Sequence, residues 1–328
     1  MEKLRSIEQF KLFQDKCRRE FEEYPLVISV CQGASCRAAG SEEVANVFEK
    51  LTTGSSDIRF IKSGCQGFCE YGPLSVVRPS NIFYQMVKPG DAAEIMRTTK
   101  DDGEVVDRLL YTHPATGEKL GREHEIEFYS KQQRIVLALN GYIDPLRIDD
   151  YLAHGGYSAL AKALQVMEPG HIIEEMIEAN LRGRGGAGYP AGWKWKSCKE
   201  APGDRRHIIC NADEGDPGAF MDQAVLEGNP HSVIEGMLIG AYAIGGTSGY
   251  IYIRHEYPQA IETFSAALDK ARELGLLGDN ILGTDFSFDI DMTFGAGSFV
   301  CGESSAVSYT HLRAHETSLH LVCRLLLE

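Results

Sequence analysis

The sequence lacks any apolar run long enough to cross a bilayer, and its charged first residues contain no core of the signal-peptide type. It also lacks an excess of positive charge, because 33 Lys and Arg residues stand against 47 Asp and Glu residues, for a net charge of −14 at pH 7. Binding to nucleic acid would need a basic face. We therefore expect a cytoplasmic protein that neither inserts into a membrane nor binds nucleic acid.

The chain is long enough for two domains, with 328 residues of which 43% are hydrophobic. Nine residues are cysteine. In a reducing compartment, that many cysteines point to metal, cluster or redox chemistry rather than to structural disulfides. The spacing of the cysteines has to distinguish these uses.

The first part of the chain has the pattern of a small α/β domain. Residues 1–24 predict a helix, and residues 25–100 predict strands and helices in the order β-α-β and then β-β-α. This order is that of a thioredoxin-like domain. A charged, loosely patterned stretch follows, and we expect residues 101–150 to be a linker.

Residues 151–306 predict a second α/β domain, which we expect to be incomplete. The expected helices are 157–167, 169–181, 230–244 and 258–275, and the expected strands are 206–212, 249–257 and 286–294. Helices of this length between strands imply parallel βαβ units.

Four cysteines follow two strands of the first domain: Cys31 and Cys36 in "CQGASC", and Cys65 and Cys69 in "CQGFC". Parallel strands would bring both loops to one end of the sheet, so four thiolates can converge. Buried inert thiols and structural zinc remain alternatives, although zinc sites favour tighter C-x2-C spacing. The pattern favours a [2Fe–2S] cluster held by all four thiolates.

A glycine-rich loop, "LRGRGGAGYPAGWKWK", follows a predicted helix rather than a strand, which disqualifies it as a Rossmann fingerprint. Backbone amides without side chains can still hold a phosphate, with two basic residues nearby. The candidate ligand-binding residues are Gly183, Arg184, Gly185, Gly186, Gly188 and Lys194. A simple turn is the competing interpretation.

An acidic loop, "CNADEGDPGAF", ends a predicted strand, where α/β folds bind ligands. Its candidate residues are Asn211, Asp213, Glu214 and Asp216. Carboxylates do not suit phosphate, but they suit the hydroxyls of a ribityl or ribose chain. Around Asp216, a solvated turn is the competing interpretation.

These motifs carry a family resemblance. The cysteine spacing resembles the [2Fe–2S] subunit of respiratory NADH dehydrogenase (complex I). The two loops, with "EGNPHSVIEGMLIGAYAIG" and "GAGSFVCGES", resemble the flavin-binding subunit of the same enzyme. The resemblance covers residues 25–306. It implies that Gly183 to Gly188 and Asn211 to Asp216 hold FMN, that Lys194 and the acidic loop seat NAD(H), and that Gly302 and Glu303 belong to the cofactor site.

The sequence departs from the family pattern at two positions. Tyr189 stands where the family often has Phe, and Ser304 follows Glu303 where complex I subunits usually have a second Glu. A carboxylate at that place would repel a 2′-phosphate, so the choice between NAD and NADP stays open.

Fusion of the two domains in one chain resembles the diaphorase subunit of soluble hydrogenases or NAD-linked formate dehydrogenases. We expect an NAD(P)H:acceptor oxidoreductase subunit that takes hydride from NADH to FMN and passes single electrons to such partner subunits. The alternative is a [2Fe–2S] electron-carrier fragment with a non-functional flavin domain. Flavin content would distinguish the two.

The resemblance stops at Ala306, whereas the family continues into a segment that binds a [4Fe–4S] cluster. Back-translation of residues 307–328 matches, in one reading frame, a transposon sequencing adapter in reverse complement and the flow-cell end that follows it. We expect this tail to be non-native and any [4Fe–4S] site to lie in a missing C-terminal part. The tail's histidines are accordingly not predicted to bind metal.

Overall fold

The computed structural model describes residues 3–102, 104–184, 187–216 and 218–295. The chain divides into two compact units, each described here by itself. The first unit contains residues 1–13, 155–223 and 231–328, and the second contains residues 14–154 and 224–230. Within the described residues, no helix combines the length and the apolar character that a membrane crossing requires.

The second unit is built on a four-stranded sheet of order β2-β1-β3-β4. Strand β1 (Leu26–Cys31) pairs in parallel with β2 (Ile58–Ser63), and antiparallel pairs join β1 to β3 (Ser75–Arg78) and β3 to β4 (Ile82–Tyr84). Three helices accompany the sheet: α2 (Ala34–Ala38), α3 (Ser41–Thr52) and α4 (Asp91–Met96). This β-α-β, β-β-α order confirms the thioredoxin-like domain.

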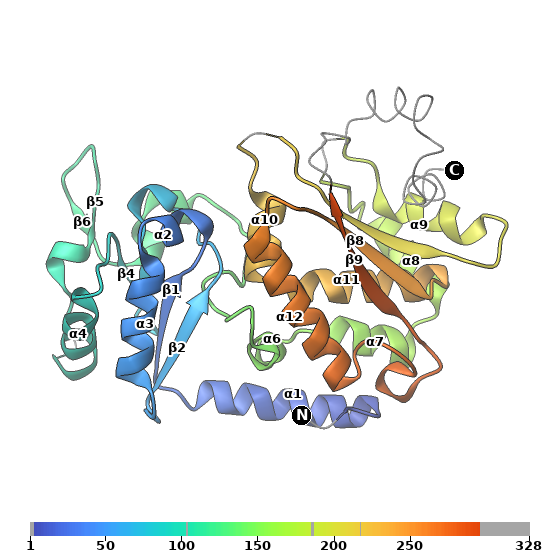
Figure 1. The fold of residues 1–328 in the computed structure, drawn as a ribbon, viewed down its shortest axis with the longest axis horizontal. Coiled ribbons are helices and arrows are strands. Elements are labelled where there is room, and N and C mark those ends of the chain that lie inside the picture. The colour runs from blue at the N-terminus through green and yellow to red at the C-terminus, as the bar shows by residue number, and fades with distance from the viewer. Residues whose placement is uncertain (1–2, 103, 185–186, 217, 296–328) are drawn as a thin grey trace. The chain divides into compact units, whose positions relative to one another are not determined.

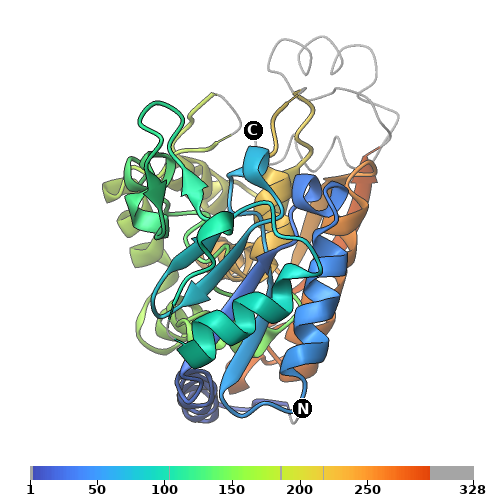
Figure 2. The same ribbon diagram turned by 90° about the vertical axis from the view of Figure 1, so that its left-hand side faces the viewer.

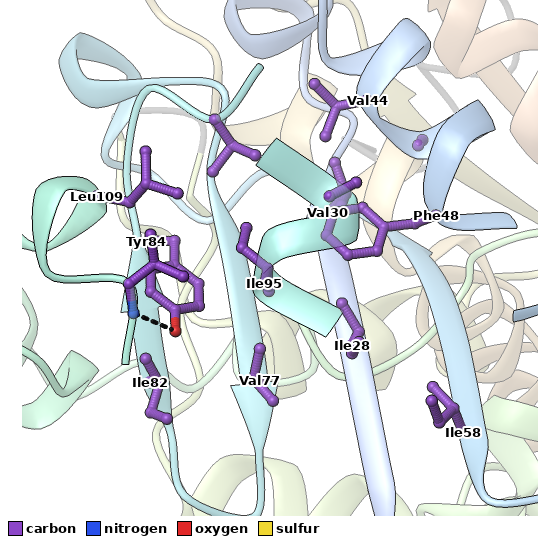
Figure 3. Close-up of a cluster of buried hydrophobic side chains, with 14 of the residues drawn as sticks. Ile28, Val30, Val44, Phe48, Ile58, Val77, Ile82, Tyr84, Ile95 and Leu109 are labelled. Atoms are coloured by element: carbon purple, nitrogen blue, oxygen red, sulfur yellow. Dashed lines mark hydrogen bonds between the residues drawn. The ribbon is translucent and has the colours of Figure 1, made fainter. Parts of the chain in front are cut away.

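The core of this unit lies between the sheet and helices α3 and α4. Val44 and Phe48 of α3 are fully buried against Ile28 and Val30 of β1, as the helix period and the strand alternation require (Figure 3). The hydroxyl of Tyr84 accepts a hydrogen bond of 3.2 Å from the backbone N–H of Val106, beyond the thioredoxin-like domain.

Residues 101–150, which the sequence predicts to be a linker, instead contain ordered structure. The elements are η3 (Asp107–Leu109), the hairpin β5 (Tyr111–Thr112) and β6 (Lys119–Leu120), η4 (Glu123–Glu125) and α5 (Glu127–Ser130); α6 (Ile148–Ala153) follows. The hairpin projects beyond the four-stranded sheet (Figures 1 and 2). Tyr111, Ile126 and Tyr129 are buried in one cluster with Cys31 and Cys36. Short turns place these side chains without helix or strand periodicity, which is why the pattern concealed them.

The first unit is built on a parallel sheet of order β7-β8-β9. Its strands are β7 (His207–Ala212), β8 (Ser248–Arg254) and β9 (Asp289–Gly295). Its longer helices are α7 (Ser158–Val166), α8 (Pro169–Glu178), α9 (Ala191–Glu200), α11 (Pro230–Ile244) and α12 (Pro258–Leu274). Helices α1 (Ile7–Glu22) and α10 (Met221–Gly228) each contribute residues to both units. The parallel pairing confirms the predicted βαβ units.

Helices α11 and α12 pack against the strands of this sheet. A Cβ atom at Gly249 of β8 would lie 2.6 Å from the Phe288 ring and 3.1 Å from the Met237 side chain of α11, so glycine permits this close approach. Helix α12 runs beside β8 and β9 (Figure 1), and its Arg272 donates to the Ile290 carbonyl at 2.7 Å. Because the strands are parallel, their carboxyl ends meet at one edge.

Candidate functional site: a four-cysteine cluster and a strand-end loop pair

The four predicted cysteines converge at one end of the four-stranded sheet. Cys31 is the last residue of β1 and Cys36 lies in α2, whereas Cys65 follows β2 and Cys69 begins η1 (Cys69–Tyr71). The parallel register, in which Cys31 pairs with Ser63, brings the two loops together. Cys31 and Cys36 are 1% exposed, and Cys69 lies at the surface.

The thiols contact one another in the order Cys36, Cys31, Cys65, Cys69. The Sγ atoms of Cys65 and Cys69 are 4.0 Å apart. Hydrogen bonding to Cys36 raises the pKa of Cys31 to about 12, and the same contact lowers the pKa of Cys36. Contact with Cys31 raises the pKa of Cys65 to about 11. Cys31 and Cys65 therefore hold protons that a metal centre would have to displace.

Two glycines leave the space in which the sulfur atoms gather. A Cβ atom at Gly33 would lie 2.8 Å from Cβ and 3.1 Å from Sγ of Cys65. A Cβ atom at Gly72 would lie 2.7 Å from Sγ of Cys36. The backbone N–H of Gly67 donates to Sγ of Cys65 at 3.4 Å, a bond that stabilises a thiolate.

The four thiols can supply the ligands of a binuclear iron centre, because they meet as neighbouring pairs. A [2Fe–2S] cluster spreads four thiolates over two irons, so it requires two neighbouring pairs rather than one tight group. The contacts of Cys31 with Cys36 and of Cys65 with Cys69 form such pairs.

Aromatic rings surround the Cys65–Cys69 loop, and sequence reasoning missed most of them. The ring of Phe68 lies 4.8 Å from that of Phe128 and 5.5 Å from that of Tyr111. Both partners come from the stretch predicted to be a linker. The signal that could have found them is the density of aromatic residues in "EIEFYS" and "LLYTH".

The glycine-rich loop connects α8 to α9 and is closed at its base. Gly183 donates its N–H to the Tyr189 carbonyl at 2.9 Å, and Arg182 donates to the Gly188 carbonyl at 3.2 Å. Gly188 has φ of +62°, a left-handed conformation that favours glycine. Lys194, in the first turns of α9, places its Nζ atom 5.8 Å from the Tyr189 ring centre. The loop thus presents a cation and a half-exposed ring together.

The acidic loop begins at the carboxyl end of β7. The Oδ1 atom of Asn211 accepts a hydrogen bond of 3.1 Å from the backbone N–H of Asp213. The Glu214 carboxylate accepts three N–H groups of α10, from Met221 at 2.8 Å, Asp222 at 3.2 Å and Gln223 at 3.3 Å. Glu214 therefore caps the start of α10, a role that its sequence pattern did not indicate.

Two further residues hold the acidic loop and were not predicted. Arg254, the last residue of β8, lies 3.7 Å from the Asp213 carboxylate and donates to the Glu214 carbonyl at 2.5 Å. Tyr257 donates its hydroxyl to the Glu214 carbonyl at 3.4 Å and stacks on Arg254. The sequence signal for Arg254 is a charged residue at the end of the alternating strand "GYIYIR". Because parallel strands end at a common edge, such a residue lies near the loop that follows the neighbouring strand.

Several predicted positions are outside the described residues: Gly185, Gly186, Gly302 and Glu303, together with the whole tail 307–328. Arg184 and Asp216 lie in the described parts of their loops. The boundary at Ala306 stays a prediction.

Comparison with known proteins finds similar proteins for the second half of the chain. Residues 176–318 match the family model of the Nuo51 FMN-binding domain, so the match extends past the expected boundary at Ala306. The chain is 55% identical over 177 residues to the NADP-reducing hydrogenase subunit HndC of Solidesulfovibrio fructosivorans, covering 54% of this chain and 36% of that protein. It is 49% identical over 160 residues to an NADH-quinone oxidoreductase subunit of Aquifex aeolicus, covering 49% and 37%. These matches confirm the resemblance to the flavin-binding subunit.

Among solved structures, a thioredoxin-like [2Fe–2S] ferredoxin from Aquifex aeolicus is similar over 27% of this chain and 99% of its own, with 27% identity and a TM-score of 0.25. The chain spans little more than a third of the length of the two curated relatives, 36% and 37%.

Proposed function

We propose that this chain, whose residues 176–318 match the Nuo51 FMN-binding domain, is the NAD(P)H-oxidising, diaphorase-type subunit of a cytoplasmic multi-subunit oxidoreductase. Its partners are further subunits of a hydrogenase or formate dehydrogenase, to which it delivers single electrons. The observation that carries the proposal is the presence, in one chain, of this domain and of four converging cysteines.

The residues divide into two sets. Bound FMN would supply the change from hydride chemistry to single-electron chemistry, and a [2Fe–2S] cluster would accept one electron at a time. Cys31, Cys36, Cys65 and Cys69 would hold the cluster. The backbone from Gly183 to Gly188 and the polar atoms from Asn211 to Asp216 would hold the flavin, with Arg184 adding positive charge.

The nucleotide would meet Lys194 and the Tyr189 ring beside it. The ammonium group can pair with a pyrophosphate, and the exposed ring can stack on a flat base or nicotinamide. Arg254 and Tyr257 would keep the acidic loop in place through the Glu214 carbonyl. Gly302 and Glu303 complete the proposed set on the basis of the family resemblance.

The test uses the purified full chain, prepared without oxygen. We expect both FMN and iron in it, at about one flavin and two irons per chain for one [2Fe–2S] cluster, and NADH-dependent reduction of a dye. Parallel assays with NADPH determine which nucleotide is preferred. Iron without flavin, and no reduction with either nucleotide, would favour the electron-carrier alternative and overturn the proposal.

A further inference from the structure

Asn140 lies in the stretch 101–150 and reaches the cysteine site from outside the thioredoxin-like domain. Its side chain is 1% exposed. The Nδ2 group donates to the Cys65 carbonyl at 3.1 Å and to the Ala224 carbonyl, also at 3.1 Å. Two carbonyl acceptors use both protons of the amide, so this orientation of the side chain is determined by its partners.

The surrounding backbone is packed around this amide. A Cβ atom at Gly64 would lie 2.3 Å from the Cα atom of Gly228 and 3.2 Å from Nδ2 of Asn140. A Cβ atom at Gly228 would lie 2.5 Å from the same Nδ2 atom. Three backbone segments, far apart in the sequence, therefore meet at one side chain that leaves no room for substituents.

The amide acts on the loop that carries two of the four sulfur atoms. Cys65 is held at its carbonyl by Asn140, and its Sγ atom accepts the N–H of Gly67. A donor at this carbonyl places the positive end of the amide dipole on the loop that carries the sulfur atom and holds the peptide plane that follows Cys65. Hydrogen bonds and partners outside the ligands are known to set the potential and stability of such centres.

We propose that Asn140 is a positioning residue for the Cys65 ligand and that its amide raises the reduction potential of the cluster. This inference rests on the proposed [2Fe–2S] cluster. It differs from a purely structural role because a residue that only fills space would change stability without changing the potential.

The test replaces Asn140 in the full chain and measures the cluster itself. Asn140→Ala is expected to move the midpoint potential to a more negative value and to change the g values of the reduced cluster in electron paramagnetic resonance. Iron should pass to a chelator about 10-fold faster than in the wild type, the lower end of the effect of outer-shell partners on metal affinity. Asn140→Asp, nearly equal in size, replaces the donor with acceptors and should also give a more negative potential.

Gln85→Ala is the matched control. Gln85 is a side-chain amide of the same unit that donates to a backbone carbonyl, that of Leu110, at 3.1 Å. It should lower thermal stability while leaving the potential and the spectrum unchanged.

Cluster-loaded Asn140 variants with the wild-type potential and spectrum would overturn this inference alone. A wild-type chain that binds no iron would overturn it together with the proposed cluster. If Asn140→Ala does not fold, the Asn140→Asp result decides.

Discussion

The cysteine site and the acidic loop are organised in opposite ways. At the cysteine site, Cys31 and Cys36 are 1% exposed, and aromatic rings and glycine backbone pack around the cysteine loops, with Cys69 at the surface. At the acidic loop, the carboxylate of Glu214 bonds to the backbone of its own unit, while Phe220 beside it is 64% exposed. One site is shaped by a packed core, and the other by hydrogen bonds among loops. They should therefore respond to different kinds of change.

Replacing a ligand should have the largest effect. Cys36→Ala is expected to abolish the visible iron–sulfur absorption and the bound iron, because alanine offers iron no ligand atom, while flavin content stays at the wild-type level. Cys198→Ser, at a buried cysteine of α9 in the other unit, is the control and should keep both. Full iron content in Cys36→Ala would contradict the ligand assignment.

Filling the space beside the sulfur atoms should have the second-largest effect. Gly33 has φ of −60°, which alanine adopts freely, so Gly33→Ala tests only the 2.8 Å approach to Cys65. We expect a loss of about 1–3 kcal/mol in unfolding free energy, typical of overpacking, and a lower iron content. Gly90→Ala is the matched control, because φ is −68° and no atom lies within 4 Å of the added Cβ. Equal iron content and melting temperature in the two variants would show that the site is loosely packed.

Removing the cap of α10 should disturb the other site by a smaller amount. Glu214→Ala deletes the acceptor of three N–H groups and is expected to cost about 1–2 kcal/mol, the usual value for a helix cap. Thermal unfolding and FMN titration measure the effect, and iron content should not change. Glu174→Ala, at an exposed position of α8, should leave both measurements near the wild type. Loss of iron in Glu214→Ala would mean that the two sites are not independently organised.

The smallest expected effect depends on pH. Burial, followed by the neighbouring Glu214 carboxylate, raises the pKa of Asp222 to about 6. Between about pH 4 and pH 6, the folded chain therefore keeps a proton that the unfolded chain has released. The free energy of unfolding thus falls as pH rises through this range. Asp222→Asn should remove that loss and be more stable than the wild type at pH 7 by about 1 kcal/mol, after allowance for solvent screening. Melting temperatures of the two proteins at pH 5 and pH 8 measure it; a constant difference between them would contradict the raised pKa.

Most of the fold could be predicted because its elements have clear periods. Helix α11 was predicted over 230–244 and is found at Pro230–Ile244, and β7 differs from its prediction by one residue. The convergence of the cysteines also followed from strand direction alone. What periodicity could not reveal were contacts made by single side chains in turns, such as Tyr111, Asn140 and Arg254. Their partners are distant in the sequence, and no local pattern records such pairings.

The burial of Tyr111, Ile126 and Tyr129 in one cluster with Cys31 and Cys36 determines how small a separable electron carrier this chain can provide. A gene fragment ending at residue 100 would keep all four proposed cysteine ligands but uncover apolar surface around them, which favours aggregation and oxidative damage. A fragment extended to residue 154 would retain that aromatic cover and Asn140. In biosensor or fusion designs, the useful module therefore ends well beyond Cys69, the last proposed ligand.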